Sequence, residues 1–392
     1  MEERPLTGIS PPGRIAAPGE GIGQDELALA ARNHGLPLEA LRYEVTPAGL
    51  HYVLVHYDIP DTGGTDAGTD AGADDSADTW RLTLRGCLRT PLELSLRDLR
   101  SLPRVTRRVT MECAGNGRAR LSPRPVSQPW LVEAVGTADW TGVPLRAVLA
   151  EAGVAPGAVE AVFTGADHGV ERGVEQDYRR SLPLPVDEDV LLAHTMNGGP
   201  LPPQHGHPLR LIVPGWYGMA HVKWLRDIEL VDTAFGGYQQ ATAYRYKQSA
   251  DEAGEPVTRI APRALMIPPG FPDFMSRTRV VRPGPLRLAG RAWSGYGPIV
   301  RVELSTDGGA DGGPGRGPDG AGGSWADAEV LPRGGHPYAW QGWHAEWTAV
   351  PGSHTLLVRA TDASGRTQPL RQPWNRGGFG NNQVQAVSVV CR

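Results

Sequence analysis

The segment from Val105 to Cys113 places the strongest limit on how this chain folds, because its apolar and polar residues alternate. This alternation predicts a strand that points Cys113 to one face and Thr110 and Glu112 to the other. The Ala-Gly-Asn-Gly sequence that follows predicts a turn whose small residues let the backbone approach a bulky group beside the sulfur. Because Arg118 adds a fixed positive charge nearby, we expect the Cys113 thiol to be biased towards the thiolate.

Two patterns of secondary structure follow each other along the chain and change near residue 250. Short helices alternate with strands over residues 80–235, which predicts a mixed α+β domain over residues 22–250. Short strands between turn signals then predict an all-β immunoglobulin-like sandwich over residues 251–392. The predicted fold class is therefore α+β. An acidic repetitive segment at 61–79 is expected to be a disordered insertion, and a Gly-rich segment at 308–324 an expanded hairpin loop.

Several elements of the first domain can be placed individually. Residues 24–33 have helical composition, and Pro144 and Gly153 bracket a second helix over residues 145–152. Residues 50–60 are the most strand-like segment before residue 80. We therefore expect a helix near the N-terminus, then a strand, ahead of the alternating helices and strands.

Cys113 admits four interpretations. A buried core cysteine is the plainest of them. A disulfide is disfavoured because the three cysteines, Cys87, Cys113 and Cys391, are odd in number and widely spaced, and without a C-x-x-C pair no iron–sulfur, zinc-ribbon or c-type haem site is encoded. A catalytic nucleophile would need a histidine base, and no local Cys/His signature of a hydrolase is present. The fourth interpretation is a soft thiolate ligand for a metal held mainly by something other than protein.

A second segment, residues 196–224, gathers histidines and cations around Gly/Pro turns. Such a loop can offer backbone N–H groups and positive charge to a phosphate, with Arg210 forking onto its oxygens and Lys223 acting as a point charge. A polar surface turn followed by a core strand is the competing interpretation. His205 and His207 also suggest zinc, but a lone H-x-H without further ligands is a weak zinc signal. The residues alone do not decide between a phosphate-binding loop and a polar surface turn.

Composition argues against several classes of protein. The chain has 392 residues and a formal net charge of −4, which disfavours a general nucleic-acid partner. Its mean hydropathy is −0.32, and it has no apolar run of about 18 residues, so we expect no membrane-spanning helix. The first residues lack a basic region followed by an apolar core, which predicts a cytoplasmic protein. No P-loop motif appears, and the one G-x-G-x-x-G match, at residues 315–320, lies inside the Gly-rich segment and not between a strand and a helix, so a nicotinamide or P-loop nucleotide site loses its main support.

Two of these segments resemble a known family. Glu112–Arg118 resembles the E-C-A-G-N-x-R signature of the sulfite oxidase family of molybdenum enzymes, and residues 196–210 and 221–224 are similar to the family's pterin-binding stretch. The resemblance implies a molybdenum–molybdopterin cofactor whose metal is bound by Cys113 and by the dithiolene of one pterin. It further implies a set of cofactor-contacting residues, namely His56, His205, Arg210 and Lys223.

The same resemblance implies roles on the substrate side. Arg118 would neutralise substrate charge, and Tyr244 would orient the substrate by hydrogen bonding, with Tyr246 as a competitor for that position. Trp130 would form a wall of the pocket. The family motif R-N-H aligns with the segment that ends in His56, so the literal Arg-Asn-His at residues 32–34 is expected to lie outside the site.

Three positions depart from the family pattern. Leu54 stands where the family has an anion-binding Arg before the cofactor-contacting His. Gly117 stands where the animal enzymes have the first of two Arg residues. Arg376 comes one place early in the family's W-N-x-R-G motif. The cofactor half of the expected site is therefore matched more fully than the anion half.

The resemblance implies a two-electron oxygen-atom transfer on a small oxyanion, with sulfite oxidised to sulfate as the leading reaction. A separate redox protein such as a cytochrome would take the electrons, because no haem-binding segment is encoded here. The C-terminal sandwich would form the contact of a homodimer. Two alternatives are a family member acting on a less charged sulfur or nitrogen substrate, and a cofactor-free binding protein with a decayed enzyme domain.

Overall fold

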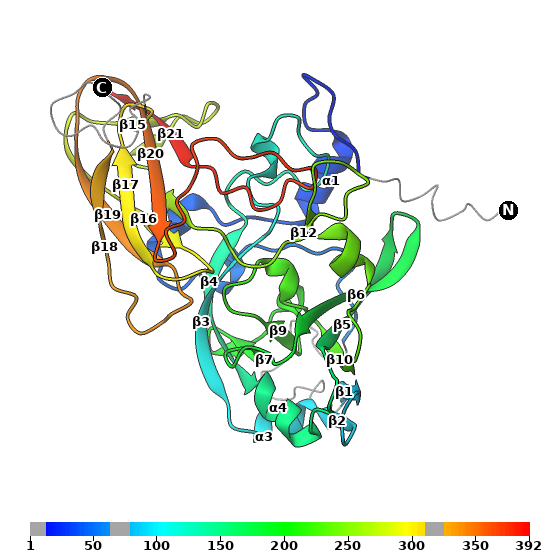
Figure 1. The fold of residues 1–392 in the computed structure, drawn as a ribbon. Helices are drawn as coiled ribbons and strands as arrows, with labels where there is room; N and C mark the ends of the chain where they lie inside the picture. Colours follow the sequence, from blue (N-terminus) through cyan, green and yellow to red (C-terminus); the bar gives the residue numbers. More distant parts are fainter. Residues whose placement is uncertain (1–12, 63–78, 310–324) are drawn as a thin grey trace.

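The computed structural model describes residues 13–62, 79–309 and 325–392, and Figure 1 shows their arrangement. The strands of the C-terminal third gather on one side of the molecule, and helices α1, α3 and α4 belong to the other part. The expected acidic insertion at 61–79 and Gly-rich loop at 308–324 fall outside the described residues except at their ends. No helix within the described ranges is long and apolar enough to cross a membrane.

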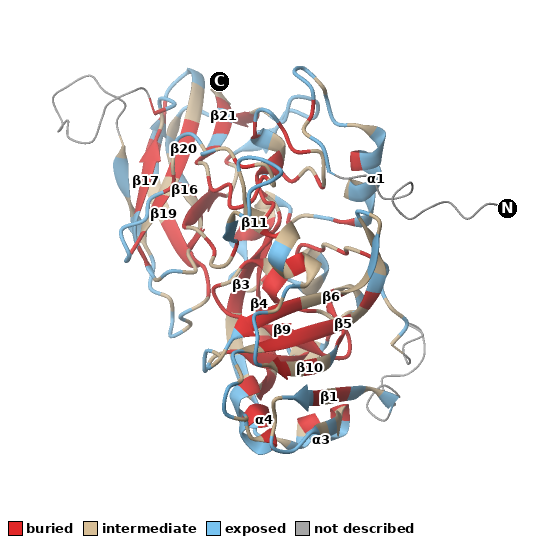
Figure 2. Ribbon diagram, turned by 45° about the vertical axis from the view of Figure 1, so that its right-hand side comes forward, coloured by how far each residue is buried: buried red, intermediate tan, exposed pale blue. Residues whose placement is uncertain are grey.

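A five-stranded sheet forms one side of the first part. Its strands lie in the order β2, β1, β10, β5 and β6, with bounds Leu92–Ser95, Arg81–Gly86, Leu225–Val231, Glu160–Glu171 and Val174–Pro183. β1 pairs with β10 in parallel, and all other neighbours in this sheet are antiparallel. The central strands β5 and β10 are largely buried (Figure 2) and contribute apolar side chains such as Phe163 and Ile228, so this sheet carries the largest core of the first part.

Two short helices pack against that core, and local sequence signals explain where each one begins or ends. Helix α3 (Leu96–Ser101) begins after Ser95, whose hydroxyl accepts a hydrogen bond from the backbone N–H of Asp98. Helix α4 (Leu145–Ala152) ends at Gly153, which has a positive φ of 69°. The predicted helix over 145–152 is confirmed, and the one predicted over 24–33 is α1 (Gln24–Arg32).

A second sheet contains β3 (Val105–Glu112), the strand that ends directly before Cys113. It contains β3, β4 (Val135–Pro144), β7 (Leu191–Met196) and β8 (Gly199–Pro200) in that order, with β9 (Arg210–Ile212) pairing with β7. Val109 and Met111 from β3 are fully buried in one core together with Cys113. Thr110 and Glu112 point to the other face and bond to residues of the C-terminal part. The alternation in the sequence therefore predicted both the strand and its two faces.

The C-terminal part is a β-sandwich built from one hydrogen-bonded path of nine strands. The path runs β13, β16, β19, β18, β17, β20, β21, β15 and β14, with bounds Arg263–Met266, Gly284–Trp293, Gln341–Ala349, Ala326–Val330, Ile299–Ser305, Gly352–Asp362, Gln385–Cys391, Arg279–Val281 and Phe271–Pro272. β18 pairs with both β17 and β19, so it connects the two layers. Trp343, Val302 and Leu356 fill one core between them. The predicted fold class, a mixed α+β domain followed by an all-β sandwich, is confirmed.

The two parts share a buried contact at the end of β3. Glu112 Oε1 lies 2.7 Å from the guanidinium Nε of Arg263, and the Trp293 indole N–H donates to Glu112 Oε2 at 2.8 Å. Glu112 and Arg263 are each about 1% exposed, and burial raises the pKa of Glu112. The residue that precedes Cys113 is thus fixed by the C-terminal part, whereas the division of the chain at residue 250 stays a prediction.

The strand predicted over residues 50–60 is wrong. The segment is irregular apart from an isolated bridge between Val53 and His34. Tyr52 and Val53 are both buried although they are adjacent, and the backbone N–H of Val55 donates to the Asn33 side chain at 2.7 Å instead of to a neighbouring strand. Because long-range contacts replace a strand partner, this segment forms part of the wall of the functional site.

Candidate active site

The turn after β3 is held by its own polar side chains. Cys113 N–H donates to Ala134 O, and the Asn116 side chain donates to Glu112 Oε1 at 3.0 Å. Gly117 has a φ of 91°, a conformation that favours glycine. A Cβ there would lie 2.9 Å from Asn381 Cγ, and Asn381 Nδ2 donates to Gly117 O at 2.6 Å. Asn381 therefore fills the space beside Gly117, where the animal enzymes have an Arg.

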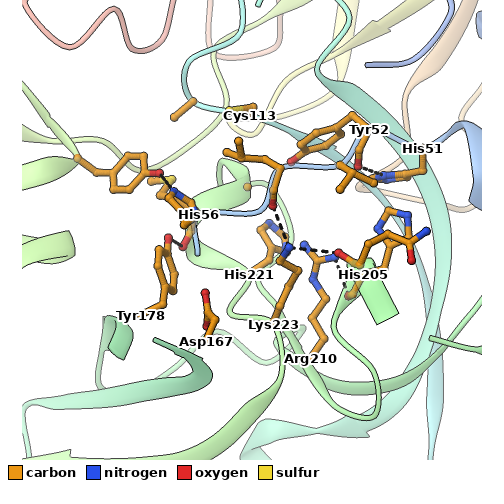
Figure 3. A pocket seen from close by; sticks show the side chains of 17 residues that line it. His51, Tyr52, His56, Cys113, Asp167, Tyr178, His205, Arg210, His221 and Lys223 are labelled. Carbon is orange, nitrogen blue, oxygen red and sulfur yellow. Dashed lines mark hydrogen bonds between the residues drawn. The ribbon is translucent and has the colours of Figure 1, made fainter. Parts of the chain in front are cut away.

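Two cavities meet beside Cys113. The inner cavity has a volume of about 50 Å³, and the outer cavity has a volume of about 570 Å³. Four residues, Leu54, His56, Cys113 and Tyr244, line both. Figure 3 shows the inner cavity, with Cys113 at the top and with His205, Arg210, His221 and Lys223 below it. The sulfur of Cys113 thus lies where the two spaces join.

The predicted cofactor residues line the inner cavity. Lys223 Nζ donates to Leu54 O at 2.8 Å and to Gln204 O at 3.1 Å, and Arg210 Nη1 donates to His205 O at 3.1 Å. His205 Nε2 and Arg210 Nε are buried and have no hydrogen-bond partner within the described part of the chain. Arg210 Nε is a donor that is costly to bury unless a ligand accepts from it, and His205 Nε2 donates or accepts according to its tautomer, so the pair favours a ligand with acceptor oxygens.

Burial sets the protonation of this inner cluster. It lowers the pKa of His205 to about 2 and that of His56 to about 3, so both imidazoles are neutral near pH 7. Burial, together with the charge of Arg210, also lowers the pKa of Lys223 to about 7, against the opposing effect of Asp167. Arg210, whose pKa burial lowers to about 10, stays charged. The cavity therefore holds one permanent cation, one cation that titrates near neutrality and neutral histidines.

The expected thiolate bias of Cys113 is wrong for the chain on its own. Burial raises the pKa of the Cys113 thiol, and the charge of Arg118 opposes this only in part. The residue is 7% exposed, so its sulfur is poorly solvated as an anion. A metal would have to displace the thiol proton, which is the usual coupling between metal binding and proton release.

Arg118 and Tyr244 lie on the outer side of Cys113. Arg118 is buried, donates to Gly377 O at 2.9 Å and to Ser127 Oγ at 3.1 Å, and lies over the Phe379 ring. Tyr244 is 8% exposed and follows a turn of π-helix at Gln239–Ala243. The structure thus places both predicted substrate-side residues in the wall of the outer cavity.

A short hydrogen bond joins Tyr244 to a predicted cofactor residue. The Tyr244 hydroxyl lies 2.6 Å from His56 Nε2. Tyr246, its sequence competitor, packs against Gly380 and lines neither cavity in the described part of the chain. Trp130 lines the outer cavity as expected, and His34 is exposed and lines neither cavity among the described residues, although its neighbour Asn33 lines the outer one.

Several residues of the inner wall were not singled out from the sequence. His51, Tyr52, Asp167, Tyr178 and His221 line the cavity, and all five are buried. Asp167 Oδ1 is buried without a partner among the described residues, while the Tyr178 hydroxyl donates to Met219 O at 2.8 Å. Asp167 follows Gly165-Ala166 within a break in the register of β5 and β6, a bulge signal that could have marked it. His51 and Tyr52 were hidden by the predicted strand.

The donor set fits a molybdopterin cofactor. Free buried donors and a permanent cation suit the anionic phosphate, and Cys113 offers a soft ligand beside them. No group of three or more His, Cys, Asp or Glu side chains able to hold a metal occurs among the described residues. A metal at Cys113 would therefore take its other ligands from a bound group.

Two family models cover most of the sequence. Residues 69–239 match the oxidoreductase molybdopterin binding domain, and residues 272–391 match the Mo-co oxidoreductase dimerisation domain. These two domains belong to molybdenum-cofactor oxidoreductases, so the expectation of a molybdenum cofactor is confirmed.

Known proteins with similar sequences or structures fall in the same group. Sulfite oxidase of Gallus gallus is 33% identical over 316 residues, which cover 76% of this chain and 66% of that protein. Nitrate reductase [NADH] 1 of Oryza sativa subsp. japonica is 29% identical, over 91% of this chain and 40% of that protein. The chain spans about half the length of most curated relatives it matches.

Among solved structures, the sulfane dehydrogenase SoxCD of Paracoccus pantotrophus superposes with a TM-score of 0.71 at 26% identity, covering 95% of this chain and 90% of that one. The likeness therefore extends through both the mixed α+β part and the sandwich. With the two domain matches and the curated relatives, it shows that the chain belongs to the sulfite oxidase family of molybdopterin-dependent oxidoreductases.

Proposed function

We propose that this protein oxidises a small sulfur oxyanion by two electrons, with the conversion of sulfite to sulfate as its reference reaction. The observation that carries the proposal is the position of Cys113 between two unlike cavities. On one side lie buried donors suited to a phosphate, and on the other lies the buried guanidinium of Arg118. A site of this form can hold a redox cofactor and bring an anion to it.

Seven residues would bind the cofactor or the substrate. Cys113 would bind molybdenum, and four side chains would contact the pterin and its phosphate: His56, His205, Arg210 and Lys223. When bound, the cofactor supplies a two-electron centre through which an oxygen atom of water reaches the substrate. Arg118 would offset the substrate's negative charge, and Tyr244 would donate a hydrogen bond to a substrate oxygen.

His56 would fix the Tyr244 hydroxyl in place. Their separation of 2.6 Å leaves the phenol able to donate to the imidazole or to accept from it. Because burial lowers the pKa of His56 to about 3, its ring is neutral, and the tautomer with its proton on Nε2 would donate to the Tyr244 oxygen and leave the hydroxyl proton for the substrate. Trp130 and Phe379 would limit access of water to this side.

The electrons would leave to a separate one-electron redox protein such as a cytochrome. The match of residues 272–391 to a dimerisation domain supports a homodimer. The alternative of a cofactor-free binding protein has less support, because the buried donors of the inner cavity would then have no acceptor.

Molybdenum analysis of protein expressed in a host that makes the cofactor tests the proposal. We expect about one molybdenum per chain and sulfite-dependent reduction of an artificial one-electron acceptor. Cys113→Ser is the matched control and should lose the activity. A protein without molybdenum from such a host would favour the cofactor-free alternative and contradict the proposal.

A further inference from the structure

The outer cavity is far larger than a sulfite ion needs. Its volume of about 570 Å³ lies in the range of pockets that hold organic ligands. Sulfite would occupy only a few times the ~30 Å³ that one water molecule takes in the liquid. The outer cavity therefore has room for a substrate bulkier than sulfite.

The part of this cavity nearest Cys113 offers little positive charge. Leu54 lines both cavities, as Cys113 does, and its side chain is aliphatic. Arg118 is there, but two of its donors are already bonded to Gly377 O and Ser127 Oγ. Asn381 occupies the space beside Gly117. These features suit an anion with one negative charge better than a dianion, because a dianion needs several converging donors.

The outer cavity also combines apolar surface with further cations. Trp130, Phe379 and Val126 supply apolar surface. Arg376 and Lys247 also line the cavity, and both are partly exposed. Gly377 follows Arg376 in the chain, and its carbonyl accepts a hydrogen bond from Arg118.

We infer that the preferred substrate is an organic sulfinate, with its oxyanion beside Arg118 and Leu54 and its apolar substituent along Trp130 and Phe379. The inference rests on the proposed function and names its substrate class. Oxidation to the sulfonate forms one sulfur–oxygen bond with the oxygen of water and releases two protons to solvent. The sulfur loses two electrons, which reduce two molecules of a one-electron redox protein in turn.

Leu54 is then the residue that sets specificity between the two oxyanions. An aliphatic wall tolerates the substituent and the single charge of a sulfinate, whereas it gives a sulfite dianion no hydrogen bond. An Arg at this position would add a charge-assisted donor and remove space for the substituent. Each such donor changes affinity for an anion by roughly tenfold to a hundredfold.

The test compares benzenesulfinate with sulfite on the molybdenum-loaded enzyme, using ferricyanide as acceptor. We expect kcat/KM for benzenesulfinate to exceed that for sulfite by about tenfold or more. Leu54→Arg should shift the ratio towards sulfite by at least about tenfold, and Leu54→Met, of similar size and without charge, should keep the parental ratio. Molybdenum content is measured for each variant.

A binding measurement makes the test independent of turnover and of the variants. Calorimetry on the oxidised holoenzyme should show tighter binding of benzenesulfonate than of sulfate. Sulfite oxidation without benzenesulfinate oxidation, or tighter binding of sulfate, would overturn this inference and leave the proposed function intact. Equal shifts in Leu54→Arg and Leu54→Met would also overturn it. A molybdenum-loaded enzyme that oxidises neither compound would contradict the proposed function as well.

Discussion

The inner and outer cavities meet at Cys113 but differ in what lines them. The inner one is small, and its two cations, Arg210 and Lys223, come from one continuous region of the sequence. The outer one is large, partly apolar and built from segments far apart in the chain, such as Arg118 and Gly377. The predicted cofactor residues of the inner cavity follow the family resemblance, whereas Leu54, which lines both cavities, departs from it. A common cofactor fixes the first set, whereas the substrate is free to differ between members.

Replacement of Cys113, which lines both cavities, should affect cofactor and substrate together. Cys113→Ser replaces a soft thiolate ligand by a hard, protonated hydroxyl of nearly the same size. We expect turnover to fall by more than about a hundredfold, beyond the usual cost of losing a supporting residue around a metal. Thermal unfolding should stay close to that of the parent. Parental turnover in this variant would make Cys113 a structural residue.

Equivalent changes in the two cavities should have different consequences. Arg210→Met removes the permanent cation of the inner cavity and should reduce cofactor retention by roughly tenfold to a hundredfold. Arg118→Met should leave the molybdenum content unchanged and raise KM for the anion by a similar factor. Elemental analysis beside steady-state kinetics separates the two results. If Arg118→Met lost molybdenum as Arg210→Met does, the two cavities would not have separate roles.

Loss of the hydrogen bond between Tyr244 and His56, which both line the two cavities, should have a smaller effect on catalysis. Tyr244→Phe removes the hydroxyl that lies against His56 and keeps the ring. We expect kcat/KM to fall by about tenfold, with molybdenum content unchanged. Tyr246→Phe is the matched control, because that ring lies outside both cavities in the described chain, and it should keep parental kinetics. An equal loss of kcat/KM in the two variants would show that Tyr244 does not contact the substrate.

The smallest expected effect is a pH dependence confined to the inner cavity. Burial lowers the pKa of Lys223 to about 7, so this cation is charged below pH 7 and is lost as the pH rises through that value. Affinity of cofactor-free protein for inorganic phosphate should therefore be lower at pH 8 than at pH 6 by severalfold, up to about tenfold. The second ionisation of phosphate works in the opposite direction.

Lys223→Arg isolates the contribution of the lysine, because an arginine stays charged over this range. Calorimetric titrations with phosphate should show that affinity falls between pH 6 and pH 8 in the parent protein and does not fall in the variant. An identical pH profile in the two proteins would mean that Lys223 does not titrate near neutrality.

The sequence predicted the features that depend on local patterns. Alternation located β3 and its faces, and the spacing of the motif brought His205, Arg210 and Lys223 into one cavity. The shape of residues 50–60 could not be predicted, because it depends on the bond from Val55 to Asn33 and on Lys223 binding Leu54 O.

Two properties of the site itself depend on tertiary structure and were also beyond local patterns. Burial raises the pKa of the Cys113 thiol, although the neighbouring Arg118 suggests the reverse. The size of the outer cavity depends on Arg118 meeting Gly377, which lies 259 residues away in the sequence. Contacts between residues so far apart in the sequence leave no periodic pattern in it. The role of an unusual residue such as Leu54 can therefore be inferred only from the structure around it.

X-ray absorption at the molybdenum edge tests the central claim most directly, because it counts the sulfur atoms bound to the metal. Parent protein and Cys113→Ser would be measured in the same oxidation state. The proposed site predicts one sulfur neighbour fewer in the variant, with the sulfur atoms of the pterin retained. An identical sulfur shell in both proteins would show that Cys113 does not bind the metal and would contradict the proposed organisation of the site.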